Sequence, residues 1–96
     1  MRVRWLRRAL ANLEEEAQYI AADNPAAAGR SVATKFAAVD RLARHPAIGR
    51  TGRAPGTREL VVSGTPYVIP YRVWGGALEI LRVFHAARQG PPEFEK

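Results

Sequence analysis

The fold is decided by three apolar runs in the C-terminal half of the chain: GTRELVV at residues 56–62, PYVIPYRVW at residues 66–74 and ILRVFHAAR at residues 80–88. Runs rich in β-branched and aromatic residues, separated by glycine-containing turns, are typical of strands. We therefore expect a three-stranded antiparallel meander. Each run also carries at least one arginine, which places cationic groups on the predicted sheet.

Two short turns join these runs, at residues 63–66 (SGTP) and 74–77 (WGGA). Glycine accommodates the positive φ angles that tight hairpin turns require. If neither turn contains a bulge, the expected cross-strand pairs are Arg72 with Glu79, Tyr71 with Ile80, Ile69 with Arg82, Val62 with Tyr67, Leu60 with Ile69, and Arg58 with Tyr71.

Side chains alternate between the two faces of a strand, so this register predicts which residues share a face. The more apolar face, on which we expect the helices to pack, carries Arg58, Leu60, Val62, Tyr67, Ile69, Tyr71, Val73, Leu78, Ile80, Arg82 and Phe84. Pro70 cannot donate a ladder hydrogen bond, and a bulge at this position would disturb part of the register.

The N-terminal half predicts a short strand at residues 3–5 and two helices. The first helix is expected over residues 7–23. The second begins at Pro25, after the N-cap residue Asn24, and runs to about Arg44. Its predicted apolar stripe contains Ala28, Val32, Phe36, Val39, Leu42 and Ala43. The three glutamates at residues 14–16 are interpreted as a solvated helix face. The predicted class is α+β: an N-terminal strand, an antiparallel helix hairpin and the three-stranded antiparallel meander.

The length of 96 residues predicts a single domain over residues 1–96, with a flexible tail at about residues 89–96. No apolar run is long enough to cross a membrane, which with the absence of cysteine favours a cytoplasmic protein. We expect no cofactor, and two well-separated histidines without cysteine predict no metal site.

The formal net charge is +6, and all but two of the 15 basic residues are arginine, the exceptions being Lys35 and Lys96. Arginine grips phosphate and carboxylate groups bidentately, which favours an acidic protein or nucleic acid as partner. A genome rich in arginine codons is the alternative explanation of the arginine bias.

Several motifs in this order resemble the ParE/RelE toxin superfamily of bacterial toxin–antitoxin modules, and in detail its ParE-like branch. The residues that carry the resemblance are Trp5, AADNPAAA at 21–28, LARHPAIGR at 42–50, GTREL at 56–60, PYVIPYRV at 66–73 and ILRVFHAAR at 80–88. The resemblance covers about residues 3–90 and implies a RelE/ParE-like fold.

The resemblance further implies a toxin that a cognate, ParD-like, DNA-binding antitoxin neutralises. Characterised ParE-like members poison DNA gyrase, whereas RelE-like members cut mRNA on the ribosome. RelE-like nucleases use lysines and often a C-terminal tyrosine, but here the predicted loop and sheet contain no lysine and no tyrosine follows His85. We therefore expect a gyrase poison that acts by binding rather than by chemistry. The alternatives are a ribosome-dependent mRNA endonuclease and a non-toxic relic that only binds antitoxin.

The sequence also departs from the family at Leu6, where a serine or threonine helix cap is frequent, and at Gly90, where an aromatic residue is frequent. The residues expected to bind antitoxin or target are Arg58, Arg72, Trp74, Arg82, His85 and Arg88. If the protein is a nuclease, its catalytic residues would be Arg58, Arg82 and His85. Direct contact with nucleic acid is a secondary expectation, and no membrane contact is expected.

Each candidate also has a structural interpretation. Arg72 and Glu79 predict a cross-strand ion pair. Arg58 and Arg82 could instead pair with carboxylates or carbonyls inside the molecule, and His85 could be structural or contact the antitoxin. The loop at residues 49–58 could cradle a phosphate with its backbone N–H groups or be a plain flexible connector.

Overall fold

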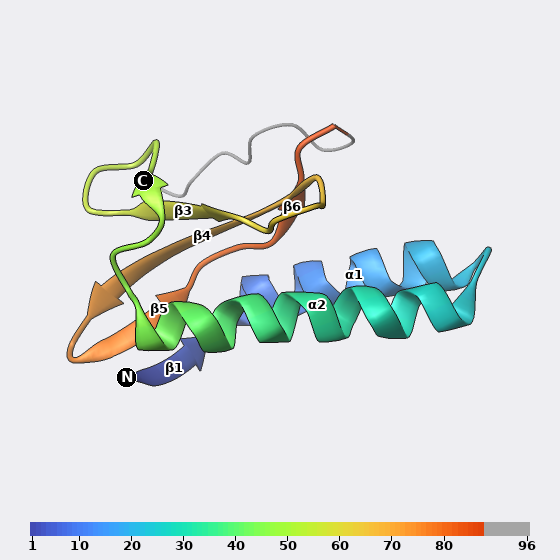
Figure 1. The fold of residues 1–96 in the computed structure, drawn as a ribbon, viewed down its shortest axis with the longest axis horizontal. Helices are drawn as coiled ribbons and strands as arrows, with labels where there is room; N and C mark the ends of the chain where they lie inside the picture. Colours follow the sequence, from blue (N-terminus) through green and yellow to red (C-terminus); the bar gives the residue numbers. More distant parts are fainter. Residues whose placement is uncertain (88–96) are drawn as a thin grey trace.

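The computed structural model describes residues 1–87, in which two helices lie side by side against one face of a six-stranded sheet (Figure 1). The elements are β1 (Arg2–Trp5), α1 (Arg7–Ala21), α2 (Pro25–Arg44), β2 (Arg50–Thr51), β3 (Arg58–Val61), β4 (Tyr67–Trp74), β5 (Ala77–Ile80) and β6 (Phe84–His85). This arrangement confirms the predicted α+β class. The predicted tail at about residues 89–96 and the candidate Arg88 lie outside the described residues.

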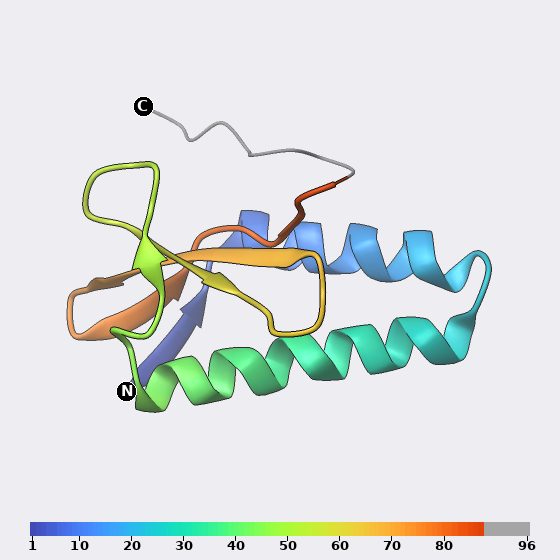
Figure 2. The same ribbon diagram turned by 45° about the horizontal axis from the view of Figure 1, so that its top comes forward.

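The sheet has the strand order β1-β5-β4-β3-β2, and β6 also pairs with β4. The β1 strand runs parallel to β5, whereas the other pairs are antiparallel. The meander of β3, β4 and β5 and the position of the N-terminal strand are as predicted. The short strand β2 was not expected, because it lies in a stretch that we interpreted as a loop (Figure 2).

The helix hairpin follows from its connection. Asn24 caps α2, since its side-chain Oδ1 accepts a hydrogen bond from the Ala27 N–H at 3.0 Å. Pro25 occupies the first turn of the helix, where its missing N–H has no cost. The α1 helix ends at Ala21, two residues earlier than predicted. The short connection therefore produces the expected antiparallel pair.

The core lies between the helices and one face of the sheet. Its buried residues are Ala9, Val39 and Leu42 from the helices and Leu60, Val62, Tyr67, Ile69, Tyr71, Leu78, Ile80 and Val83 from the sheet region. The Trp5 ring packs on the Phe36 ring with their centroids 5.2 Å apart. Phe36 is nevertheless 45% exposed, so its predicted place on the buried stripe of α2 is wrong.

Tyr71 ties the segment that follows α2 to the sheet. Its hydroxyl donates to the Pro46 carbonyl at 2.7 Å and accepts from the Gly49 N–H at 2.9 Å. A Cβ atom at Gly49 would lie 2.5 Å from this hydroxyl oxygen, so the contact requires glycine. Burial raises the pKa of Tyr71, while the Gly49 hydrogen bond and the charge of Arg58 oppose that rise.

The predicted register holds near the Gly75-Gly76 turn, where both glycines have positive φ. Arg72 faces Glu79 and Tyr71 faces Ile80, as expected. The predicted pair of Ile69 with Arg82 is wrong. β5 ends at Ile80, and β6 resumes the pairing one residue out of step, with Val68 opposite Phe84.

Pro70 explains why the pairing along β4 is interrupted between β5 and β6. The Leu81 N–H donates to the Pro70 carbonyl at 2.9 Å, but proline has no N–H to return. The extra residue moves Val83 into the core and puts Phe84 on the same face as Val68, so the predicted faces of Arg82 and Phe84 are wrong. The Val83 N–H finds an acceptor in the Asn12 side chain at 3.2 Å.

Candidate functional site

We call the sheet face opposite the helices the outer face; it carries Glu59, Pro70, Arg72, Trp74 and Glu79. Glu59 and Glu79 are only 3% exposed, although both are charged residues on a small protein. Burying a carboxylate is costly unless cations and hydrogen-bond donors compensate it. The surrounding arginines provide that compensation.

Glu79 is held by one arginine on each carboxylate oxygen. The Arg72 Nε donates to Oε1 at 2.7 Å, and the Arg4 guanidinium donates to Oε2 at 3.1 Å. The side chains of Arg72 and Arg4 are 38% and 53% exposed. The predicted cross-strand pair of Arg72 and Glu79 is therefore confirmed, and β1 contributes a second cation.

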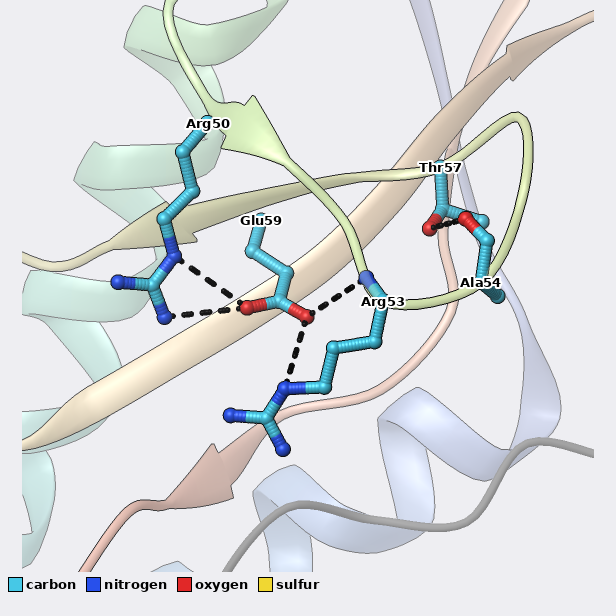
Figure 3. Close-up of polar contacts among 5 residues, drawn as sticks. All are labelled: Arg50, Arg53, Ala54, Thr57 and Glu59. Carbon is cyan, nitrogen blue, oxygen red and sulfur yellow. Dashed lines mark hydrogen bonds and ion pairs between the residues drawn. The ribbon is translucent and has the colours of Figure 1, made fainter.

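Glu59 has the same arrangement (Figure 3). Arg50 donates to Oε1 at 3.1 Å and the Arg53 Nε lies 3.6 Å from Oε2. The Arg53 backbone N–H also donates to Oε2 at 3.4 Å. Arg50 is the direct cross-strand neighbour of Glu59, so the unexpected strand β2 brings this cation into place.

The loop between β2 and β3 is closed by its own hydrogen bonds. The Gly52 N–H donates to the Thr57 carbonyl at 2.9 Å. The Thr57 hydroxyl donates to the Ala54 carbonyl at 2.6 Å (Figure 3). The N–H groups of Gly52 and Arg53 already have partners within the protein, so these two groups are not available to cradle a phosphate. The loop instead presents the Arg53 side chain beside the outer face.

A cleft of about 820 Å³ lies where this loop, the start of α1 and the outer face meet. We call it the arginine cleft; its described lining is Leu6, Arg7, Arg8, Arg53, Ala54, Pro55, Thr57, Arg72, Leu81 and Arg82. Five of these residues are arginines, and none of the described lining residues is acidic. The cleft therefore combines positive charge with an apolar wall.

The predicted site residues separate into two groups. Arg72, Trp74 and Arg82 lie on or beside the outer face. The Trp74 ring is 62% exposed and lies under the Arg72 guanidinium at 4.8 Å. Arg82 lines the arginine cleft and donates through Nε to the Asn12 Oδ1 at 2.9 Å. These three residues could contact a partner together.

Arg58 and His85 lie elsewhere. The Arg58 guanidinium donates to the Gly49 carbonyl at 2.9 Å and the Ala47 carbonyl at 3.4 Å, beside the end of α2. His85 pairs with Tyr67, and the two rings meet edge-on with centroids 5.3 Å apart. The structure therefore brings neither residue to the outer face.

A buried polar cluster that the sequence did not lead us to expect lies between the helices and the start of β4. The Tyr67 hydroxyl donates to the Glu16 carboxylate at 3.0 Å. The Lys35 ammonium lies 3.6 Å from the centroid of the Tyr67 ring and donates to the Ser31 hydroxyl at 3.0 Å. Glu16 is 4% exposed, so its interpretation as part of a solvated face is wrong.

The helical spacing contained the signal for this cluster. Lys35 continues the buried positions Ala28, Val39 and Leu42 of α2 at intervals of three, four and seven residues. A stripe made of apolar residues alone predicts Phe36 in the core, whereas Lys35 is the buried residue. The arginine cleft had no comparable signal, because only the tertiary fold brings Arg53 beside Arg7 and Arg8.

No group of histidine, cysteine or acidic residues in residues 1–87 is arranged to hold a metal ion. Within the same residues, no helix is long and apolar enough to cross a membrane.

Comparison with known proteins adds the family. Residues 3–90 match the family model described as the ParE toxin of the type II toxin–antitoxin system parDE. The chain is 52% identical over 90 residues to Y4kP, a predicted toxin of Sinorhizobium fredii, covering 94% of this chain and 93% of that protein. It is 45% identical over 84 residues to the toxin RelE2 of Caulobacter vibrioides, covering 88% and 93%.

Among solved structures, the chain is similar to one from the chromosomal ParDE toxin–antitoxin system of P. aeruginosa. The TM-score is 0.79 at 30% identity, and the match covers 88% of this chain and 95% of the other. The strand, helix hairpin and antiparallel strands described above thus form a ParDE-like fold. The chain belongs to the ParE toxin family of type II toxin–antitoxin systems, within the RelE/ParE superfamily.

Proposed function

We propose that this toxin inhibits bacterial growth in the cytoplasm by binding and poisoning DNA gyrase, and that a cognate ParD-like antitoxin neutralises it. Membership of the ParE family supports both parts of this proposal. The fold would act as a rigid platform that presents a recognition surface, with no covalent step of its own.

The distance between the residues that a nuclease would use is the observation that supports a binding mechanism. General acid–base cleavage of RNA requires a proton carrier within reach of the groups that stabilise the phosphate. Arg58 faces Tyr71 and His85 faces Tyr67, four positions along β4, which corresponds to roughly 13 Å.

The third nuclease candidate does not close this gap. Arg82 bonds to Asn12 of α1, whereas Arg58 bonds to backbone carbonyls near Gly49. Lys35, the only lysine among the described residues, is 1% exposed beneath the sheet and is no substitute for a cleft lysine. These contacts favour the binding mechanism over the ribosome-dependent endonuclease.

For the recognition surface we propose Arg72, Trp74 and Arg82. Arg58 and His85 lie away from these three residues, and Arg88 lies outside the described residues. Exposed Trp and Arg side chains frequently dominate binding energy at interfaces. The cationic outer face would complement an acidic antitoxin segment, which could bind as an amphipathic helix or an extended chain.

The direct test is a supercoiling and DNA-cleavage assay with purified gyrase and toxin. We expect loss of supercoiling and accumulation of cleaved DNA, both reversed by the cognate antitoxin. We expect the His85→Ala variant to inhibit as the parent chain does. Unaltered supercoiling at a large excess of toxin, together with mRNA cleavage on ribosomes that needs His85, would overturn the proposal.

The recognition surface is tested with the Trp74→Ala variant. Tyr19→Ala is its matched control, because Tyr19 is an aromatic residue of nearly equal exposure, 61% against 62%, on α1. We expect Trp74→Ala to weaken gyrase inhibition or antitoxin binding and Tyr19→Ala to leave both unchanged. If both variants inhibited gyrase and bound antitoxin as the parent chain does, Trp74 would not be part of the recognition surface.

A further inference from the structure

The arginine cleft gathers cations from separate parts of the chain into one compact space. Arg7 comes from the first turn of α1, Arg53 from the loop after β2, Arg72 from β4 and Arg82 from the segment after β5. The volume of about 820 Å³ lies within the range of about 300–1,000 Å³ that small-molecule sites occupy. The cleft thus has the size of a site for a small organic ligand.

Three of these arginine side chains are each held by an interaction of their own Nε atom with another residue of the protein. The Arg72 Nε donates to Glu79, the Arg82 Nε donates to Asn12, and the Arg53 Nε pairs with Glu59. Among residues 1–87, no hydrogen bond or ion pair engages the terminal nitrogens of these three side chains. Each side chain is therefore held by its inner nitrogen while its terminal N–H donors remain available to a ligand.

Such donors match phosphate better than carboxylate. A chain of phosphates places several anionic oxygens within a few ångströms, and arginine forks bind these oxygens bidentately. The carboxylates of an extended peptide are spread along the backbone, because successive side chains point to opposite sides. Several converging guanidinium groups therefore favour a compact polyanion.

The remaining lining suits the organic part of such a ligand. Leu6, Pro55 and Leu81 provide an apolar wall. The Thr57 hydroxyl hydrogen is already donated to the Ala54 carbonyl. The described lining thus offers apolar contact and cationic donors but no carboxylate or amide acceptor to read a base, so the site should discriminate poorly between bases.

From these observations we propose that the arginine cleft binds a nucleoside polyphosphate, with its phosphates on the guanidinium groups and its base or sugar against the apolar wall. This site goes beyond the proposed function and does not depend on it, since binding needs neither gyrase nor antitoxin. Affinity should rise with the number of phosphates and fall with ionic strength.

The test is competition against a fluorescent ATP analogue, followed by anisotropy with the purified full chain. We expect ATP and CTP to compete about equally, ADP more weakly than ATP, and adenosine not at all. Loss of one charge-assisted contact should weaken binding about tenfold or more, so Arg7→Gln and Arg82→Gln should each do so. Arg7→Gln keeps the test valid, because the Arg7 side chain has no partner in the described protein that the substitution could disturb.

The matched control is Arg41→Gln, which removes the same charge from the exposed last turn of α2, away from the cleft. If Arg41→Gln weakened nucleotide binding as much as the cleft variants do, the net charge of the protein would explain the effect and the proposal would be overturned. Tripolyphosphate that binds as tightly as ATP would also overturn it, because the apolar wall would then contribute nothing. A single-stranded oligonucleotide that binds far more tightly than ATP would make nucleic acid the ligand instead.

Discussion

The two faces of the sheet are made by alternating residues of the same strands, yet different forces stabilise them. Toward the helices, Ile69, Tyr71, Leu78 and Ile80 are completely buried among apolar neighbours. On the outer face, Glu59 and Glu79 are almost as deeply buried, but arginines surround them. Adjacent residues such as Leu78 and Glu79 therefore occupy opposite chemical environments.

This difference separates stability from recognition. Burial of apolar surface is the dominant favourable term in folding and requires no partner. The arginine side chains of the outer face are between 38% and 55% exposed, so each can satisfy a buried carboxylate and still present part of its guanidinium group to a ligand. We expect substitutions on the helix-facing side to act mainly on stability and substitutions on the outer face mainly on binding.

The largest expected effect on stability is from Leu78→Ala. Leu78 has no exposed surface, and deleting a buried leucine side chain removes its transfer free energy and leaves a cavity. The free energy of unfolding, measured by urea titration, should fall by about 3 kcal/mol. Val73→Ala, its half-exposed partner across the strands, should cost only about 0.5 kcal/mol. Equal losses would mean that the core does not centre on Leu78.

A smaller loss is expected from Glu79→Gln. The substitution removes the carboxylate charge and one of its two acceptor oxygens, but Arg4 and Arg72 remain hydrated because they are 53% and 38% exposed. The free energy of unfolding should fall by about 1–2 kcal/mol, less in high salt. The control is Asp40→Asn, which breaks the exposed Asp40–Arg44 pair and should cost about 0.3–0.5 kcal/mol. If Glu79→Gln lowered the free energy of unfolding no more than Asp40→Asn does, burial would add nothing to the ion pairs of the outer face.

The smallest expected effect is a pH dependence of the stability, caused by a residue on the helix-facing side of the sheet. Burial raises the pKa of Tyr71 in the folded protein above its ordinary value of about 10. The folded state then holds this proton more tightly than the unfolded state, so the contribution is fully present below about pH 10 and is lost as the pH rises through the folded pKa.

This contribution can be isolated with the Tyr71→Phe variant. Unfolding titrations between about pH 8 and about pH 11 should show the parent chain losing more stability than the variant. Parallel curves would indicate that Tyr71 titrates alike in both states. At neutral pH the variant should itself be less stable by about 1–2 kcal/mol, because the Gly49 N–H and the Pro46 carbonyl lose their buried partner.

The two ends of β4 show how far the sequence could predict the fold. Near Gly75-Gly76 the turn dictates the pairing, so the contact of Arg72 with Glu79 was predictable. At the other end, Pro70 indicated a bulge but not which residue would take the extra place. That choice depended on Asn12 of α1, which accepts from the Val83 N–H across 71 positions of sequence.

Local patterns of polarity, glycine and proline were enough to predict the N-terminal strand, the helix hairpin with its cap at Asn24, the meander and the family, but not the short strand β2. Three outcomes became visible only in three dimensions: Arg82 bonds to Asn12 of α1, Glu16 and Lys35 are buried together, and Arg7, Arg53 and Arg72 meet in one cleft. These outcomes depend on which distant side chains share a space. Periodicity along the chain reports which face a residue occupies, but it does not report what lies opposite that face.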